Sequence, residues 1–290
     1  MTRIITSLSE ISESYDALFC DLWGCVHDGL TPFAEAVAAL QAFRAKGGTV
    51  MMVTNAPRPH APVRRQLERL GVPSDAYDGI ATSGDSARAA MLRGAVGEKV
   101  YFIGQSHDQD FFTPLELIEN PVVISQVALE QAEGIVCCGP FDPLADPDEM
   151  RAHFLQAKAR GLKLLCANPD IVVDRGETRE WCAGALAKLY TEMGGESLYF
   201  GKPHPPIYDL ARRRLEALGK DIPDSRILCV GDGILTDIDG AMGEDLDSLF
   251  ITGGLAAQET QTTDQPDPAA LTAYLTKEMR QPTYCIGKLR

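Results

Sequence analysis

Short, unbroken apolar runs that alternate with helix-like stretches constrain the fold of this chain more than any other feature. Because the runs are continuously hydrophobic, we expect strands that are buried on both faces of a parallel sheet. The alternation predicts an α/β fold with a doubly wound parallel sheet, whose ligands bind outside the carboxyl ends of the strands. The predicted strands are Ala17–Asp21, Thr49–Thr54, Gly79–Thr82, Val100–Gly104, Gly134–Gly139, Lys163–Asn168, Leu198–Phe200, Ile227–Asp232 and Ser248–Thr252.

The stretches between these runs predict amphipathic helices. The first helix is predicted to begin with Thr31 as its N-cap and Pro32 at its first position, and to end at Gly47 and Gly48. The same spacing of apolar residues predicts helices over Ala61–Leu70, Met150–Arg160 and Ile207–Leu218.

The middle of the chain predicts a second domain. Strands and helices alternate again between residues 97 and 195, and Gly-rich joints flank this segment on both sides. The segment also lacks the acidic and cationic motifs described below. We therefore predict one domain formed by residues 1–96 and 196–290, and a second domain, residues 97–195, inserted into it.

Charge and cysteine content exclude several classes of protein. The net charge of −14 argues against nucleic acid or an anionic membrane as a partner. No apolar run reaches the roughly 18 residues of a membrane span, and the N-terminus does not resemble a signal peptide, so we expect a cytoplasmic protein. The eight cysteines include no Cys-x-x-Cys pair, which predicts reduced, structural thiols instead of a zinc or redox site.

Four short segments, far apart in the sequence, place polar residues at or just after predicted strand ends. Because parallel strands end at the same edge of a sheet, we expect these residues to form one site. Each residue alone also fits a structural role, such as capping a turn or a helix. The occurrence of all these residues together favours a functional site over separate structural roles. The segments supply Asp21, then Thr54 with Asn55, then Lys202, and finally Asp232 with Asp237.

These residue types fit magnesium-dependent phosphoryl transfer. A carboxylate such as Asp21 can attack phosphorus and form an aspartyl-phosphate. A strand-end hydroxyl and amide can donate hydrogen bonds to phosphoryl oxygens, and Lys202 can neutralise charge between nucleophile and phosphate. Asp21 and Asp232 are the predicted pair of Mg²⁺ ligands, because Mg²⁺ takes one or two carboxylates and keeps several waters. Asp237 is predicted to hold Asp232 or Lys202 in place.

Together the four segments resemble the four motifs of the haloacid dehalogenase superfamily of phosphohydrolases, over roughly residues 15–255. The segments Thr82–Asp85 and Cys166–Asp170 resemble more narrowly its class IIA group, a sugar- and nucleotide-phosphatase branch. The resemblance implies a Rossmann-like core and an inserted α/β cap of the C2 type. It further implies a small phosphorylated metabolite as substrate, such as a sugar phosphate or a nucleotide, and is compatible with a homodimer.

The same resemblance implies roles for further residues. The backbone carbonyl of Trp23 is expected to join Asp21 and Asp232 as a ligand of Mg²⁺. In the inserted segment, Asn168 and Asp170 are expected to contact the substrate.

Trp23 departs from the family pattern. The resemblance predicts an aspartate two residues after Asp21, where it protonates the leaving alcohol and later activates water. An indole N–H does neither at neutral pH, and loss of a general acid costs about 10²–10⁴-fold in rate. His27 and Asp28, in the next loop, are candidate substitutes.

Three functions therefore stay open. We predict a hydrolase that removes phosphate from a small metabolite through an aspartyl-phosphate. The first alternative is a regulatory protein that binds metal and phosphate but has impaired turnover. The second is another reaction on the same scaffold, such as phosphonate cleavage or phosphoryl transfer to an acceptor other than water.

Overall fold

The computed structural model describes residues 2–113 and 120–290, and its strands fall into three sheets. The larger sheet contains β1 (Arg3–Ile4), β2 (Ala17–Cys20), β3 (Thr49–Thr54), β4 (Gly79–Thr82), β12 (Ile227–Gly231), β13 (Asp247–Ile251) and β14 (Tyr284–Ile286). The smaller sheet contains β5 (Lys99–Ile103), β6 (Ser125–Gln126), β7 (Gly134–Cys137), β8 (Lys163–Cys166) and β11 (Glu196–Tyr199). A two-stranded ribbon is formed by β9 (Val172–Arg175) and β10 (Thr178–Trp181).

Helices cover both sheets. They are α1 (Ala34–Ala45), α2 (His60–Leu70), α3 (Ser83–Leu92), α4 (Arg151–Ala159), α5 (Ala183–Glu192), α6 (Pro205–Ala217), α7 (Asp239–Gly243) and α8 (Pro268–Glu278). None of the described helices combines the length and the apolar character needed to cross a membrane.

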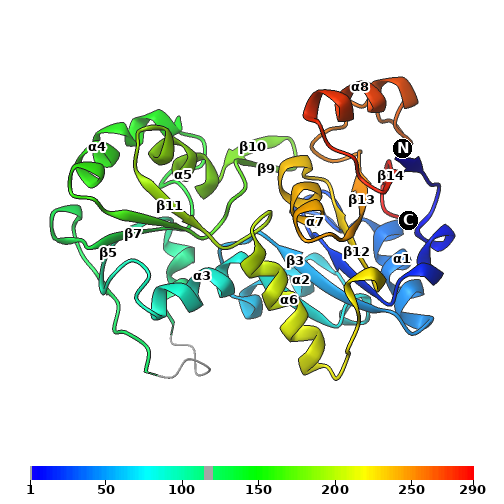
Figure 1. The fold of residues 1–290 in the computed structure, drawn as a ribbon, viewed down its shortest axis with the longest axis horizontal. Helices are drawn as coiled ribbons and strands as arrows, with labels where there is room; N and C mark the ends of the chain where they lie inside the picture. Colours follow the sequence, from blue (N-terminus) through cyan, green and yellow to red (C-terminus); the bar gives the residue numbers. More distant parts are fainter. Residues whose placement is uncertain (1, 114–119) are drawn as a thin grey trace.

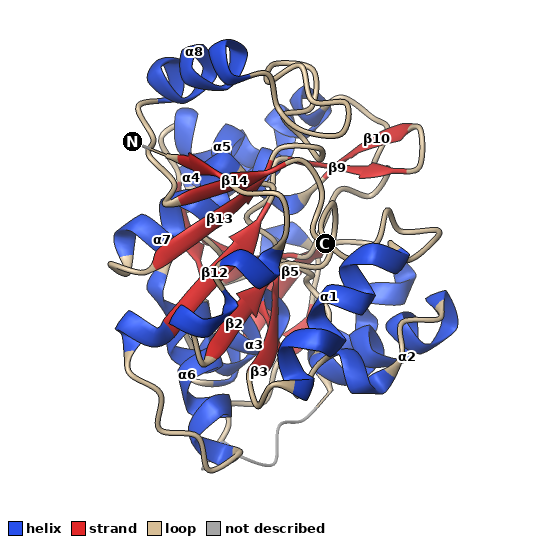
Figure 2. Ribbon diagram, turned by 90° about the vertical axis from the view of Figure 1, so that its right-hand side faces the viewer, coloured by secondary structure: helices blue, strands red, loops and turns tan. Residues whose placement is uncertain are grey.

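The order of strands confirms the predicted α/β class. The larger sheet runs β1-β14-β13-β12-β2-β3-β4 and the smaller one β11-β8-β7-β5-β6 (Figure 1). All pairs of neighbours in these two sheets are parallel, whereas β9 and β10 pair antiparallel. Seen from the side, β14, β13, β12, β2 and β3 lie next to one another across the larger sheet (Figure 2). Neighbouring parallel strands therefore present their carboxyl ends at a common edge.

Alternate residues of the central strands face opposite layers of helices, as continuous apolar runs require. Leu18 and Cys20 of β2 belong to the buried cluster that includes Leu40 of α1 and Leu67 of α2. Phe19, between them, belongs to a second cluster with residues of α6 and α7. Burial on both faces holds the central strands, and the residues that follow them, in fixed positions.

All nine predicted strands exist, but several end before their last predicted residue. Asp21, Asn168 and Asp232 follow their strands instead of belonging to them. The short strands β1, β6 and β14, and the ribbon of β9 and β10, were not predicted because they lack long apolar runs. All eight cysteines are buried and unpaired, as expected.

The predicted start of the first helix is wrong. The helix α1 begins at Ala34 and Phe33 is its N-cap. Thr31 belongs to the preceding turn instead, where its backbone N–H donates to Asp28 Oδ1 at 2.7 Å. The Asp28 carboxylate thus binds the backbone N–H of Thr31 within a turn, and Thr31 does not act as the N-cap of the helix.

The smaller sheet and its helices lie on the left of Figure 1, and both chain termini lie beside the larger sheet on the right. Helices α4 and α5 pack on one face of the smaller sheet, and residues of α3 pack on the other. Strand β11 continues this sheet to Tyr199, past the predicted boundary at residue 195. The division into a core domain and an inserted cap stays a prediction.

Candidate active site

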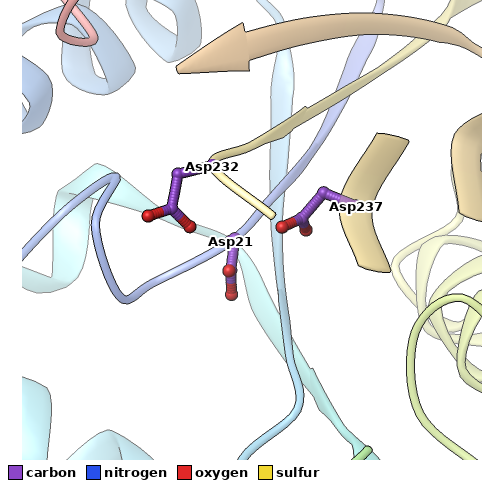
Figure 3. Close-up of side chains that lie close together, drawn as sticks. All are labelled: Asp21, Asp232 and Asp237. Atoms are coloured by element: carbon purple, nitrogen blue, oxygen red, sulfur yellow. The ribbon is translucent and has the colours of Figure 1, made fainter. Parts of the chain in front are cut away.

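The carboxyl ends of β2 and β12 bring three aspartates together. The two strands are neighbours, Cys20 pairs with Val230, and the next residues along each strand lead to Asp21 and Asp232. Asp237 lies on a π-helical turn, Ile234–Ile238, just after β12. Each of the three carboxylates offers an oxygen that lies within 4.8 Å of the other two (Figure 3). The sequence had predicted all three residues for one site.

Lys202 adds a cation to this cluster. Its Nζ atom lies 2.9 Å from Asp21 Oδ1 and 2.7 Å from Asp237 Oδ1, and the residue is only 3% exposed. Burial opposes the charge on Lys202, but the Asp21 and Asp237 carboxylates outweigh it and raise the lysine pKa well above its usual value. The lysine therefore stays charged and holds the two aspartates in place.

Asp232 is the carboxylate without a compensating charge. In residues 2–113 and 120–290, no cationic side chain lies within 4.0 Å of it, and its Oδ2 atom accepts a hydrogen bond from Leu255 N at 3.0 Å. Burial first, and then the neighbouring Asp21 and Asp237, raise the pKa of Asp232 well above its usual value. Three buried carboxylates and one ammonium group leave excess negative charge, which a divalent cation with a preference for oxygen ligands would offset.

Two glycines leave the space that the Asp232 carboxylate occupies. A Cβ atom built on Gly24 or on Gly254 would lie 2.0 Å from Asp232 Oδ2. Gly24 also has a φ of +71°, a conformation that other residues rarely adopt. Sequence reasoning gave no signal for Gly254, which becomes apparent only from its close approach to Asp232 in space.

Asn55 connects three parts of the site. Its Oδ1 atom accepts a hydrogen bond from Lys202 N at 2.7 Å, and its Nδ2 group donates to Lys202 O at 3.1 Å and to Asp170 Oδ1 at 2.8 Å. Both polar atoms of the amide are thus engaged within the protein. The neighbouring Thr54 accepts a hydrogen bond from Ala56 N at 3.3 Å, so its hydroxyl proton remains available to a ligand.

Two cavities meet at the predicted nucleophile. One, of about 190 Å³, is lined by all three clustered aspartates. The other, of about 140 Å³, is lined by Thr54, Arg58, Asn168 and Arg175 among others. Asp21, Trp23, Asp170 and Val173 line both cavities. Sequence reasoning did not single out Arg58 or Arg175, because an isolated arginine in a loop or a polar strand carries no functional signal.

The Trp23 side chain is held between the loop that follows β2 and the ribbon. Its ring packs edge-on against His27 with centroids 5.1 Å apart, and the Arg175 guanidinium carbon lies 5.3 Å from the ring centroid. The Trp23 carbonyl accepts no hydrogen bond from the part of the chain that the structure describes. Its lone pairs therefore remain available to a metal ion.

Neither predicted substitute for the missing acid is poised to donate a proton. His27 is buried, its Nδ1 atom accepts a hydrogen bond from Gly29 N at 3.0 Å, and burial lowers its pKa to about 4. Asp28 accepts backbone hydrogen bonds from Thr31 and Leu30; the bond from Thr31 is the largest cause of its lowered pKa. At neutral pH the imidazole is uncharged and the carboxyl group is ionised.

Comparison with known proteins agrees with this geometry. The family model described as haloacid dehalogenase-like hydrolase matches residues 18–117, and a second HAD hydrolase-like model matches residues 199–277. The first range contains Asp21 and Thr54, and the second contains Lys202, Asp232 and Asp237. The stretch between the two matches lies mostly within the predicted inserted domain.

Solved structures and a curated relative add to this comparison. A haloacid dehalogenase-like hydrolase from Brucella suis is 40% identical, with a TM-score of 0.86 over 99% of this chain and 100% of its own. D-glycerol 3-phosphate phosphatase of Mycobacterium tuberculosis is 26% identical over 98% of this chain and 72% of its own. A crystal structure of glycerol phosphate phosphatase from the same organism in complex with magnesium has a TM-score of 0.68 at 25% identity, over 97% of this chain and 77% of its own.

The family predicted from the four motifs is thereby confirmed, and the structural neighbours come from its class IIA branch. This protein belongs to the haloacid dehalogenase-like hydrolases.

Proposed function

We propose that this protein is a Mg²⁺-dependent phosphatase that acts on a small phosphorylated metabolite through an aspartyl-phosphate. One observation carries the proposal: Lys202 bridges Asp21 and Asp237, while Asp232, a few ångströms away, has no cation of its own among the described residues. This is the arrangement expected where a divalent cation offsets the excess negative charge and helps to hold a phosphate. The phosphatase names of the relatives from Mycobacterium tuberculosis support the same reaction class.

Asp21 is the proposed nucleophile. Its Oδ1 atom is fixed by Leu22 N at 2.8 Å and by Lys202 Nζ at 2.9 Å, whereas no hydrogen bond from the described residues reaches Oδ2. Oδ2 is thus the oxygen left to attack phosphorus. Thr54 is positioned to donate its hydroxyl proton to a phosphoryl oxygen, and Lys202 offsets the charge on the phosphoryl group.

Asp21, Asp232 and the Trp23 carbonyl are the proposed Mg²⁺ ligands. Asp232 Oδ1 and the Trp23 carbonyl oxygen accept no hydrogen bond from the described residues. Asp21 would share its carboxylate, with Oδ1 towards the metal and Oδ2 towards phosphorus. When bound, Mg²⁺ supplies positive charge that orients a phosphoryl group and stabilises the transition state. Asp237 is the least suited of the three aspartates, since its oxygens are engaged by Lys202 Nζ at 2.7 Å and Gly233 N at 3.0 Å. We assign it the role of positioning Lys202.

The cavity of about 140 Å³ is the proposed site of the leaving group. It opens from Asp21 towards Asn168 and the ribbon, so its far wall comes from the predicted cap. A cavity of this volume admits a small metabolite, whereas a polymer would have to remain outside it.

The test is hydrolysis of p-nitrophenyl phosphate by the full chain, with and without added Mg²⁺. We expect turnover only with Mg²⁺, and a loss of about 10³-fold or more in kcat for Asp21→Asn. Asp209→Asn, which alters an exposed carboxylate on α6, should keep wild-type turnover. Mg²⁺-dependent binding of inorganic phosphate without turnover would favour the regulatory alternative. Release of phosphate from a phosphonate alone would favour the other reaction class.

A further inference from the structure

Asp170 occupies a central place between the two sheets. It follows β8 by a short loop and precedes β9, and it lines both cavities that meet at Asp21. Trp23, which stands where a general acid is expected, lines the same two cavities. The Asp170 carboxyl group therefore lies beside the same cavities as Trp23, whose own side chain supplies no acid.

We propose that Asp170 is the general acid of this enzyme and protonates the leaving group in place of the residue at position 23. The inference rests on the proposed phosphatase function. The sequence predicted only that Asp170 contacts the substrate. The proposal adds the donation of a proton to the leaving group.

The contacts of Asp170 leave one oxygen free for this step. Its Oδ1 atom accepts a hydrogen bond from Asn55 Nδ2 at 2.8 Å, and its backbone N–H donates to Asn168 Oδ1 at 3.0 Å. Among the described residues, no donor reaches Oδ2 and no cation lies within 4.0 Å of the carboxyl group. Asn55 therefore fixes the carboxyl group, while Oδ2 remains able to carry and release a proton.

The surroundings favour the protonated form. Burial raises the pKa of Asp170 to about 6, although Lys202 and the hydrogen bond from Asn55 oppose the increase. Asp21 and Asp237 are the nearby carboxylates. The thiols of Cys166 and Cys182 also face it, and burial raises their pKa values so that they stay neutral. An approaching phosphate adds negative charge and favours the protonated carboxyl group further.

The other titratable side chains of the leaving-group cavity are engaged or exposed. Glu180 pairs with Arg175 at 2.9 Å, and Asp108 Oδ2 accepts a hydrogen bond from Gln105 N at 2.9 Å. The His107 side chain is 59% exposed. Apart from the nucleophile Asp21, Asp170 is therefore the acid of this cavity, within the described part of the chain, that combines a fixed position with a raised pKa.

Asp21 Oδ2 forms a bond to phosphorus while the bond from phosphorus to the leaving oxygen breaks. That oxygen keeps the electron pair and takes the proton of Asp170, so that the products are an alcohol, the aspartyl-phosphate and the Asp170 carboxylate. In the second half, water attacks phosphorus and passes one proton to Asp170. The bond from phosphorus to Asp21 breaks, which releases phosphate and restores both aspartates.

The experiment compares leaving groups in Asp170→Asn. Asparagine keeps the acceptor oxygen for Asn55 but cannot donate an acidic proton. With an alkyl phosphate such as glycerol 3-phosphate, we expect kcat to fall by about 10²–10⁴-fold. With p-nitrophenyl phosphate, whose leaving group needs little protonation, the loss should be much smaller. The double variant Trp23→Asp/Asp170→Asn should recover part of the alkyl phosphatase rate, because it restores an acid on the other side of the site.

Equal losses on both substrates, or no loss on either, would overturn the proposal. Circular dichroism and thermal unfolding establish that each variant is folded before the rates are compared. A wild-type protein that hydrolyses p-nitrophenyl phosphate but no alkyl phosphate would also overturn it, because a working acid should support both. Absence of p-nitrophenyl phosphate hydrolysis in the wild type would instead contradict the proposed function itself.

Discussion

The Nζ atom of Lys202 lies 2.9 Å from Oδ1 of Asp21, so the cation that precedes α6 is joined to the carboxylate that follows β2. This contact links the first of the four polar segments, which contains Asp21, to the third, which contains Lys202. It also sets the electrostatic balance of the site, because Lys202 is the cation that faces three buried aspartates in the described structure.

Lys202→Ala should abolish phosphatase turnover, with a loss of about 10²–10³-fold or more in kcat/KM, because it removes charge stabilisation of the phosphoryl group. Affinity for inorganic phosphate should fall as well. Rates with p-nitrophenyl phosphate and phosphate binding by calorimetry measure the two effects. Lys163→Ala, at an exposed lysine of β8, is the control. Unchanged turnover and phosphate affinity in Lys202→Ala would show that the assignment is wrong.

Asp232→Asn should change metal affinity and stability in opposite directions. We expect the dissociation constant for Mg²⁺ to rise at least ~10-fold, because a carboxylate ligand is lost. The metal-free variant should unfold at a higher temperature than the metal-free wild type, because the substitution removes repulsion among buried carboxylates. Calorimetric Mg²⁺ titration and thermal unfolding in EDTA test both parts. A variant that binds Mg²⁺ as tightly as the wild type would exclude Asp232 as a ligand.

The contribution of Asp237 to the stability of the metal-free protein should decrease as the pH rises. Burial raises the pKa of Asp237 from 3.8 to about 6, so the folded state holds a proton that the unfolded chain releases. The resulting stability is complete below about pH 4 and is lost as the pH rises through about 6. Mg²⁺ binds the ionised carboxylates, so the stabilisation it gives should grow over the same window. Thermal unfolding with Mg²⁺ or EDTA across this range measures it; an effect of Mg²⁺ that does not change with pH would contradict the charge argument.

Trp23→Phe should distinguish the effects of the backbone carbonyl of this residue from the effects of its ring. Because a carbonyl ligand does not depend on the side chain, Mg²⁺ affinity should stay within about threefold of the wild type. The contact between Arg175 and the ring should weaken, since tryptophan gives the strongest cation–π interaction. We expect KM to increase more than kcat decreases. Steady-state kinetics and a Mg²⁺ titration measure these effects. A large loss of both Mg²⁺ affinity and kcat would contradict the prediction.

Gly254→Ala should displace the Asp232 carboxylate. The new Cβ atom would lie 2.0 Å from Oδ2, at a position where the backbone itself is not strained. We expect weaker Mg²⁺ binding and a loss of stability of about 1–3 kcal/mol from overpacking. Gly243→Ala is the matched control, because a Cβ there meets nothing within 4 Å. If both variants bound Mg²⁺ like the wild type, the close packing around Asp232 would have no functional importance.

The sequence was sufficient to predict how the aspartates come together. Asp21 and Asp232 each follow an apolar run, and parallel strands that are buried on both faces must end at one edge of the sheet. Lys202 was predicted to face Asp21 or the phosphate beside it, because the negative charge of three aspartates and a phosphate needs a nearby cation. These inferences depend on local pattern and on simple electrostatics, which a single sequence contains.

Contacts between the two sheets could not be predicted in the same way. The hydrogen bond from Asn55 to Asp170, and the position of Arg175 over Trp23, depend on how the ribbon of β9 and β10 is placed in space. The ribbon is polar and only partly buried, so no apolar run marks it. The error at Thr31 had a different cause, because an aspartate three residues earlier offered its backbone N–H a competing partner.

The order of strands in the larger sheet has a consequence for synthesis on the ribosome. Strand β2 lies between β3, which follows it closely in the chain, and β12, which is made only after all strands of the smaller sheet. A nascent chain therefore leaves one edge of β2, and the nucleophile beside it, unpaired until Ile227–Gly231 has been translated. Lys202 and Asp232 come from the same later part of the chain. A nascent chain that lacks these residues thus holds the proposed nucleophile without its lysine and without its second carboxylate ligand for metal.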